Sequence, residues 1–171
     1  DVLKWGNLLP SCKKSNTTKG ELNTSLFPII NPIIDNPKDH LKITGFRFYD
    51  KSEIGRRTID YTALNDRQHF VNKRYDIGIK VIELIEEIHQ NFNTLIIEPV
   101  NNHQKIKRLM SKYKSLMNEG NRKEEYAATI STTILNDENN KILINLLKDH
   151  NLWDEELDEL FAELNFCSLC D

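Results

Sequence analysis

The side chains best suited to chemistry are concentrated between residue 5 and residue 20 of this 171-residue chain. A hard cation such as Mg²⁺ prefers oxygen ligands, and the side-chain amide of Asn16 can supply one such oxygen. Lys19 carries a point charge of the kind that binds phosphate groups. Each has an ordinary alternative, because Asn favours helix N-caps and a helical Lys is usually solvated. Metal-assisted cleavage of a phosphodiester would also require a base that activates water.

The order of residues in this segment resembles the second half of the HNH nuclease motif, the ββα-metal fold. HNH proteins have an Asp-His pair on a first strand, a Trp-x-Asn-Leu second strand and a helix opened by Cys-x-x-Cys-Asn-x-x-Lys-Gly. The matching stretches here are Trp5-Gly6-Asn7-Leu8 and Cys12-Lys13-Lys14-Ser15-Asn16-Thr17-Thr18-Lys19-Gly20. The resemblance implies that Asn7 braces the loop bearing the catalytic His, Asn16 helps to hold the metal, and Cys12 begins a structural zinc pair.

The chain departs from the motif in two places. No Asp-His pair precedes Trp5, so we expect the catalytic Asp and His to lie upstream of Asp1. Ser15 stands where the second Cys should be, and because Ser is a poor zinc ligand, the zinc site is either lost or completed by another group. Asp39-His40 and Asp149-His150 both follow the expected helix, which is the wrong order for the motif.

A second set of residues resembles a pattern found in one HNH subgroup, which includes the nuclease subunits of Septu-type bacterial anti-phage systems. The matching pieces are Asn31-Pro32, Pro37 with His40-Leu41, Thr58-Ile59, Leu64-Asn65 and Arg74. Over residues 3–75 the resemblance implies a metal-dependent DNA endonuclease that uses Mg²⁺ or another divalent cation. It also implies DNA and an ABC-type ATPase as partners, within a complex that could be a higher-order hetero-oligomer.

The elements expected around these residues make an α+β fold. Leu41, Ile43, Phe46 and Phe48 alternate with polar residues across Gly45, which predicts a hairpin. The prolines within residues 28–35 exclude a helix and favour an extended path that covers a core. Together with these elements, the HNH resemblance implies that residues 1–74 form a partial ββα-metal core with a small β extension to about residue 60.

From residue 75 the apolar spacing becomes helical. It predicts helices over residues 75–92, 106–117, 124–135 and 141–148. A last helix should have an apolar stripe on one face, formed by Trp153, Leu157, Leu160, Phe161 and Leu164. Residues 75–171 are therefore expected to form a C-terminal helical domain.

The two parts differ in charge. Residues 1–74 carry 13 Lys/Arg and 8 Asp/Glu, a net charge of +5, whereas residues 75–171 carry 10 and 18, a net charge of −8. A basic face around a metal suits a phosphodiester, while an acidic part is expected to meet a protein. The residues expected to bind DNA are Lys13, Lys14, Lys19, Arg56 and Arg57. Arg74 is expected to anchor the helical part through an ion pair.

Residues 149–171 hold eight acids and no Lys or Arg. The apolar stripe of this segment is either buried within its own domain or docked against the ATPase subunit or a second copy. His40 is expected to be a structural histidine rather than a catalytic one.

Composition narrows the remaining classes. No apolar run approaches a membrane span and no signal peptide is visible, so the expected compartment is the cytoplasm, without membrane association. Three cysteines do not form a disulfide framework. Cys167 and Cys170 have the spacing of metal ligands and with Cys12 would make three thiolates, but they are expected to be free thiols. Two further functions stay open: a catalytically degenerate scaffold that binds DNA or a partner, and an RNA-cutting HNH-like toxin.

Overall fold

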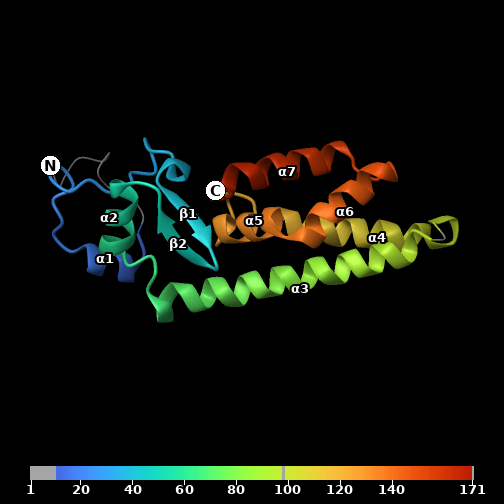
Figure 1. The fold of residues 1–171 in the computed structure, drawn as a ribbon, viewed down its shortest axis with the longest axis horizontal. Coiled ribbons are helices and arrows are strands. Elements are labelled where there is room, and N and C mark those ends of the chain that lie inside the picture. Colours follow the sequence, from blue (N-terminus) through green and yellow to red (C-terminus); the bar gives the residue numbers. More distant parts are fainter. Residues whose placement is uncertain (1–10, 98, 171) are drawn as a thin grey trace.

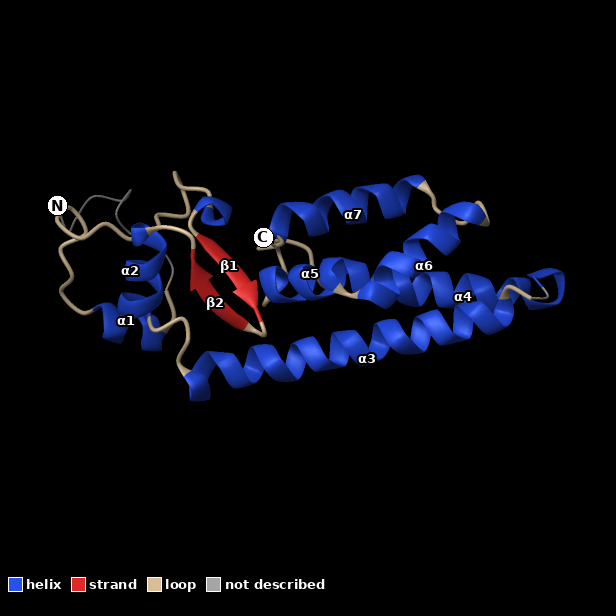
Figure 2. Cartoon of the chain, in the orientation of Figure 1, coloured by secondary structure: helices blue, strands red, loops and turns tan. Residues whose placement is uncertain are grey.

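The computed structural model describes residues 11–97 and 99–170, and the expected strand through residues 3–9 and the role of Asn7 lie outside these. Two strands and seven α-helices are described in chain order: α1 (Lys13–Lys19), β1 (Leu41–Thr44), β2 (Arg47–Asp50), α2 (Glu53–Thr62), α3 (Asn72–Leu95), α4 (Pro99–Asn118), α5 (Ala127–Asn136), α6 (Glu138–Asp149) and α7 (Glu155–Cys167). The expected α+β class is confirmed. α1, α2 and the hairpin lie toward one end of an elongated molecule, and α3 to α7 run toward the other (Figure 1, Figure 2).

The predicted hairpin is confirmed as an antiparallel pair, β1 with β2, in which Ile43 faces Phe48. Its two-residue turn is Gly45-Phe46, with φ angles of 54° and 64°. Positive φ at both positions is the type I′ geometry that matches the twist of the flanking strands.

The predicted β extension to about residue 60 is wrong, because the sheet ends at Asp50 and α2 follows. Ser52 caps this helix by accepting a hydrogen bond from the Gly55 amide at 3.1 Å. Glu53 lies in the first turn, where the helix dipole favours an acid. A good cap and an acidic first turn therefore start a helix here.

The Pro-rich segment covers the core less than expected. Ile33 and Ile34 are 66% and 78% exposed, so the predicted cover is wrong for them. The Asn31 side chain accepts a hydrogen bond from the Ile33 amide at 3.1 Å, which folds the chain into a local turn. Only the preceding Ile30 packs against the hairpin cluster, and its amide donates to the Thr58 hydroxyl at 2.8 Å.

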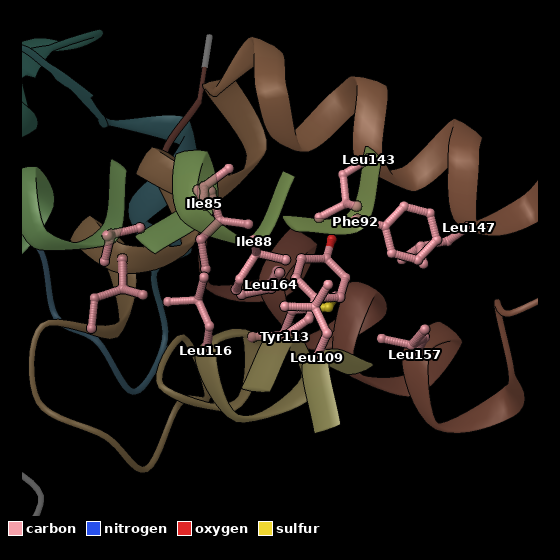
Figure 3. Packing of buried hydrophobic residues seen from close by; sticks show 14 residues of the cluster. Ile85, Ile88, Phe92, Leu109, Tyr113, Leu116, Leu143, Leu147, Leu157 and Leu164 are labelled. Carbon is pink, nitrogen blue, oxygen red and sulfur yellow. The ribbon is translucent and has the colours of Figure 1, made fainter. Parts of the chain in front are cut away.

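The helices enclose the main hydrophobic core, and the predicted stripe of α3 points into it (Figure 3). Each of the four other helices also contributes buried side chains. The most deeply buried large side chains are Tyr113, Phe92, Ile85, Ile88, Leu116, Met117, Ile134, Leu143, Leu147, Leu157 and Leu164. Leu157 and Leu164 are fully buried, so the stripe of α7 lies within the molecule, as the first alternative predicted.

Arg74 joins the hairpin to α3, and the predicted ion pair is wrong. Its side chain is only 4% exposed, and its Nε donates to the Phe46 carbonyl oxygen at 2.9 Å. A terminal nitrogen donates to the Leu64 carbonyl oxygen at 2.6 Å, and the guanidinium lies 4.7 Å from the centre of the Phe48 ring. Burial lowers the pKa of Arg74 to about 10. Carbonyl oxygens and an aromatic face take the place of a carboxylate partner.

Among the described helices, none has the length and apolar character needed to cross a membrane.

Candidate functional site

The candidate site begins at α1, whose N-cap is Cys12. The Cys12 sulfur accepts a hydrogen bond from the Ser15 amide at 3.4 Å and lies 3.3 Å from the Ser15 hydroxyl. These hydrogen bonds lower the pKa of the Cys12 thiol, and the one with the Ser15 hydroxyl has the largest effect. Asn16 is the fourth residue of the helix, so its expected alternative role as the N-cap is wrong.

Asn16 and Lys19 lie three residues apart in α1 and therefore share a helix face. The Asn16 side chain is exposed and that of Lys19 is half-buried. Neither side chain makes a hydrogen bond or ion pair with any other described residue, so both are available for a ligand. The structure thus leaves one amide oxygen and one ammonium group free on the same side of the helix.

The five cations expected to bind DNA differ in their surroundings. Lys14 forms an ion pair with Asp66, with Nζ and Oδ2 3.1 Å apart. Arg57 pairs with Glu53, and Arg56 lies 3.8 Å from the same carboxylate. Lys13 is exposed. Since α1 packs against α2, these cations lie on two adjoining helices (Figure 1).

A carboxylate and an imidazole that the sequence analysis missed lie beside α1. Asp66 accepts two hydrogen bonds from His69, one from its amide at 2.9 Å and one with Nδ1 at 2.8 Å. These two bonds and the hydrogen bond from Lys14 lower the pKa of Asp66 well below its usual range. The bond from the His69 backbone amide has the largest effect. The available signal was an Asp followed three residues later by His, which is the spacing of an N-cap and its N3 partner.

A hollow of about 520 Å³ adjoins this carboxylate–imidazole pair. Lys14 and Cys12 from the α1 end, His69 before α3 and Lys73 within α3 line it, together with Glu125 and two aromatic residues. Two lysines and an imidazole could bind an anion such as phosphate. Asn16, Lys19, Arg56 and Arg57 are not among its lining residues, so the hollow and the free face of α1 are two neighbouring surfaces.

The sulfur ligands are not assembled into a metal site. All three cysteines are free thiols, with Cys12 beside α1 and Cys167 and Cys170 at the end of α7. In residues 11–97 and 99–170, no group of three or more His, Cys, Asp and Glu side chains could hold a metal ion. His40 binds the cap residue of α2, with Nδ1 2.7 Å from the Ser52 hydroxyl, as expected for a structural histidine.

One known protein is similar to this chain over most of its length. The chain is 34% identical over 165 residues to the Septu protein PtuB of Bacillus thuringiensis. The chain is PtuB-like. The match covers 94% of this chain, so it extends through most of the described fold.

The PtuB-like chain spans 63% of the length of that relative. No protein-family model matches the sequence, and no solved structure matches it. The HNH assignment of residues 5–20 therefore depends on the motif and on the free face of α1, and it stays a prediction.

Proposed function

We propose that the PtuB-like chain belongs to an HNH-type, metal-dependent DNA endonuclease subunit of a bacterial anti-phage defence complex. The similarity to a Septu protein over 94% of the chain is the observation that carries this proposal. An ABC-type ATPase is the proposed partner and the cytoplasm the proposed compartment. The motif residues support the nuclease assignment because Asn16 and Lys19 lie on one short helix capped by Cys12, and their side chains bind no other described residue.

The proposed chemistry divides between a cation and the residues of α1. A divalent cation, when bound, neutralises charge on the scissile phosphate and on the leaving oxygen. The exposed amide oxygen of Asn16 fits the oxygen preference of Mg²⁺ and would be one of its ligands. Lys19 would hold a phosphate oxygen from the same face of the helix, and the exposed Lys13 and Arg56 would contact flanking phosphates.

Structural zinc fits the described residues poorly. Cys12 is the one thiolate of the motif, and its sulfur caps α1 beside the Ser15 hydroxyl. Because structural zinc sites are normally four-coordinate, one thiol beside a hydroxyl is an insufficient donor set. The proposed mechanism therefore includes no step that involves zinc.

The test uses the full-length protein, its ATPase partner with nucleotide, supercoiled DNA and Mg²⁺. Asn16→Ala should lower the cleavage rate at least about 10-fold, since loss even of an outer-shell partner of a metal ligand typically costs 10- to 100-fold. Thr17→Ala is the matched control, because it changes an exposed residue of the same helix. Equal rates for Asn16→Ala and Thr17→Ala would remove Asn16 from the metal site.

A second function, a non-catalytic scaffold, is favoured by Ser15 in the place of a zinc-binding Cys. Such a subunit would bind DNA or the ATPase and would not cut. Absence of cleavage by the wild-type complex on DNA and on RNA, under every nucleotide condition, would support it. Cleavage of RNA alone would instead support the toxin alternative.

A further inference from the structure

The acidic helical part contains one helix of the opposite charge. α4 has five Lys or Arg residues and no Asp or Glu, although residues 75–171 as a whole have a net charge of −8. α7, in contrast, has five acids and no Lys or Arg. Charge in this part of the molecule is therefore separated onto different helices.

Three of the α4 cations lie on one face. Lys105, Arg108 and Lys112 are spaced by three and four residues, which places them on adjacent turns along one side of the helix. They line a hollow of about 400 Å³ beside Asn91 and Thr94 of α3. We call this surface, formed by these five residues, the α3–α4 groove. The two helices that form it run alongside each other (Figure 1).

The groove keeps most of its positive charge. Lys105 and Arg108 are exposed and pair with no carboxylate among the described residues. Lys112 shares its charge with Glu87, at 2.8 Å. The next cation of α4, Lys114, lies away from the groove and is held by two carboxylates of the α7 end, each at 2.5 Å. The acids near α7 thus neutralise the opposite side of α4 rather than the groove.

We propose that the α3–α4 groove binds the phosphate backbone of a nucleic acid. Lys112 lies seven positions after Lys105, about 10 Å along the helix at 1.5 Å per residue, a length suited to consecutive phosphates. Asn91 and Thr94 add amide and hydroxyl groups of the kind that donate to phosphate oxygens. The identification of the nucleic acid as DNA rests on the proposed function, while the groove itself does not.

A protein partner fits this surface less well. The residues that contribute most to protein interfaces are chiefly Trp, Tyr and Arg side chains in well-packed pockets from which water is excluded. The large hydrophobic side chains that are exposed in the described residues do not include any residue lining the groove, whose own leucines are mostly covered. A backbone of phosphates requires only cations and hydrogen-bond donors, which is what the groove offers.

The groove and the α1 face would bind different parts of one nucleic acid. The groove uses the C-terminal end of α3, and α1 lies at the opposite end of the molecule (Figure 1). α3 has 24 residues and so spans roughly 36 Å. A duplex lying along it would extend about ten base pairs between the two surfaces at 3.4 Å per pair. The groove would therefore orient the duplex without touching the site of cleavage.

The test measures binding of the full-length protein to a fluorescein-labelled 30-base-pair duplex by anisotropy, between about 50 and 200 mM salt. The variant is Lys105→Gln/Arg108→Gln/Lys112→Gln. The control, Lys80→Gln/Lys123→Gln/Lys141→Gln, removes the same charge from exposed positions elsewhere. Thermal melts establish that both variants are folded.

We expect the groove variant to bind at least about 10-fold more weakly than the control. The slope of its log binding constant against log salt concentration should be less steep than that of the control by about 2 to 3. The reason is that about 0.9 of a counterion is released per phosphate contacted. Equal affinities for the groove and control variants, or no duplex binding by the wild type, would overturn the proposal. Loss of ATPase binding with unchanged DNA affinity would overturn it in favour of an acidic protein partner.

Binding is read without cleavage, so this result is separable from the proposed function. A wild-type protein that binds through the groove and never cuts DNA would contradict the nuclease and leave the groove in place. Cleavage by the wild type together with unchanged binding by the groove variant would contradict the groove proposal and leave the nuclease proposal in place.

Discussion

The backbone amide of Ile43 donates a hydrogen bond to the carbonyl oxygen of Leu169 at 2.9 Å. The Leu169 amide in turn donates to the Thr132 hydroxyl of α5 at 2.8 Å. The Leu169 side chain is 6% exposed and packs with Leu41 and Ile43 in the hairpin cluster. The segment after α7 therefore fastens the hairpin to the helices.

Leu169→Ala should destabilise the protein by about 2 kcal/mol or more, because it leaves a cavity between strand β1 and α5. Denaturant unfolding measures the change, and hydrogen exchange of the Ile43 amide should accelerate with it. Ile34→Ala is the control, since Ile34 is 78% exposed and should change stability by less than about 0.5 kcal/mol. Equal effects of the two substitutions would show that Leu169 does not hold the hairpin.

Gly78→Ala should also be destabilising, against the usual preference for Ala inside a helix. A Cβ at position 78 would collide with the ring of Phe46. That ring has little freedom, because the Phe46 carbonyl is bound by Arg74 and its ring packs edge-on against Tyr75 at 5.6 Å. Crowding of this kind costs about 1 to 3 kcal/mol.

Phe46→Gly supplies the matched test of that collision. Glycine tolerates the φ of 64° at position 46 and removes the ring. When Gly78→Ala is introduced into the Phe46→Gly protein, it should leave the free energy of unfolding unchanged or raise it. An unchanged cost in the two backgrounds would mean that the collision is not the cause.

Tyr113→Phe should cost about 1 to 3 kcal/mol, because it leaves a buried polar group without its partner. The Tyr113 hydroxyl donates to the Asn140 side-chain oxygen at 2.8 Å, and both residues are 1% exposed. The side-chain nitrogen of Asn140, Nδ2, already lacks a partner among the described residues. In Tyr113→Phe/Asn140→Leu both polar groups are absent, so much of the stability should return. A double variant less stable than Tyr113→Phe would contradict this assignment.

The Arg122–Glu163 pair should contribute a pH-dependent part of stability. Arg122 donates to both Glu163 oxygens, at 2.6 and 2.7 Å, and these bonds lower the pKa of Glu163 to about 2 from 4.5. A lowered carboxyl pKa stabilises the folded state above the unfolded pKa, and this stabilisation is lost as pH falls through the folded pKa. Thus the contribution should be complete above about pH 4.5 and disappear toward pH 2.

Glu163→Gln should therefore be less stable than wild type at pH 7, with a difference that narrows between pH 4.5 and pH 2. The difference should be at most about 1 kcal/mol, because the Arg122 side chain is 53% exposed and solvent weakens the pair. Thermal melts across this range measure it. Glu159→Gln changes an exposed acid of the same helix, and its difference from wild type should not show this narrowing. A constant deficit of Glu163→Gln at all pH values would exclude the linkage.

Local patterns account for most of the secondary structure that was predicted correctly. The spacing from Ile77 to Phe92 was enough to predict α3, because a buried stripe on a helix repeats every three or four residues. Alternation across Gly45 likewise predicted the hairpin and its turn. α2 was missed although its Ser52 cap is a local signal, because its ten residues include only two aliphatic side chains, Ile54 and Ile59, which are too few to show a repeat by themselves.

The sequence by itself determined the order of the helices from α3 onward, the hairpin, and the position of Asn16 and Lys19 on one short helix, since these depend on neighbours within a few residues. Only the tertiary structure decided the partners of the charges that interact with residues far away in the sequence. Arg74 meets carbonyl oxygens of the hairpin turn rather than an acid, and Lys14 meets Asp66. The tertiary structure also decided that three cations of α4 face α3, within the acidic half of the chain. The physical reason is that a charge interacts through space, so its partner is set by which distant segments pack together.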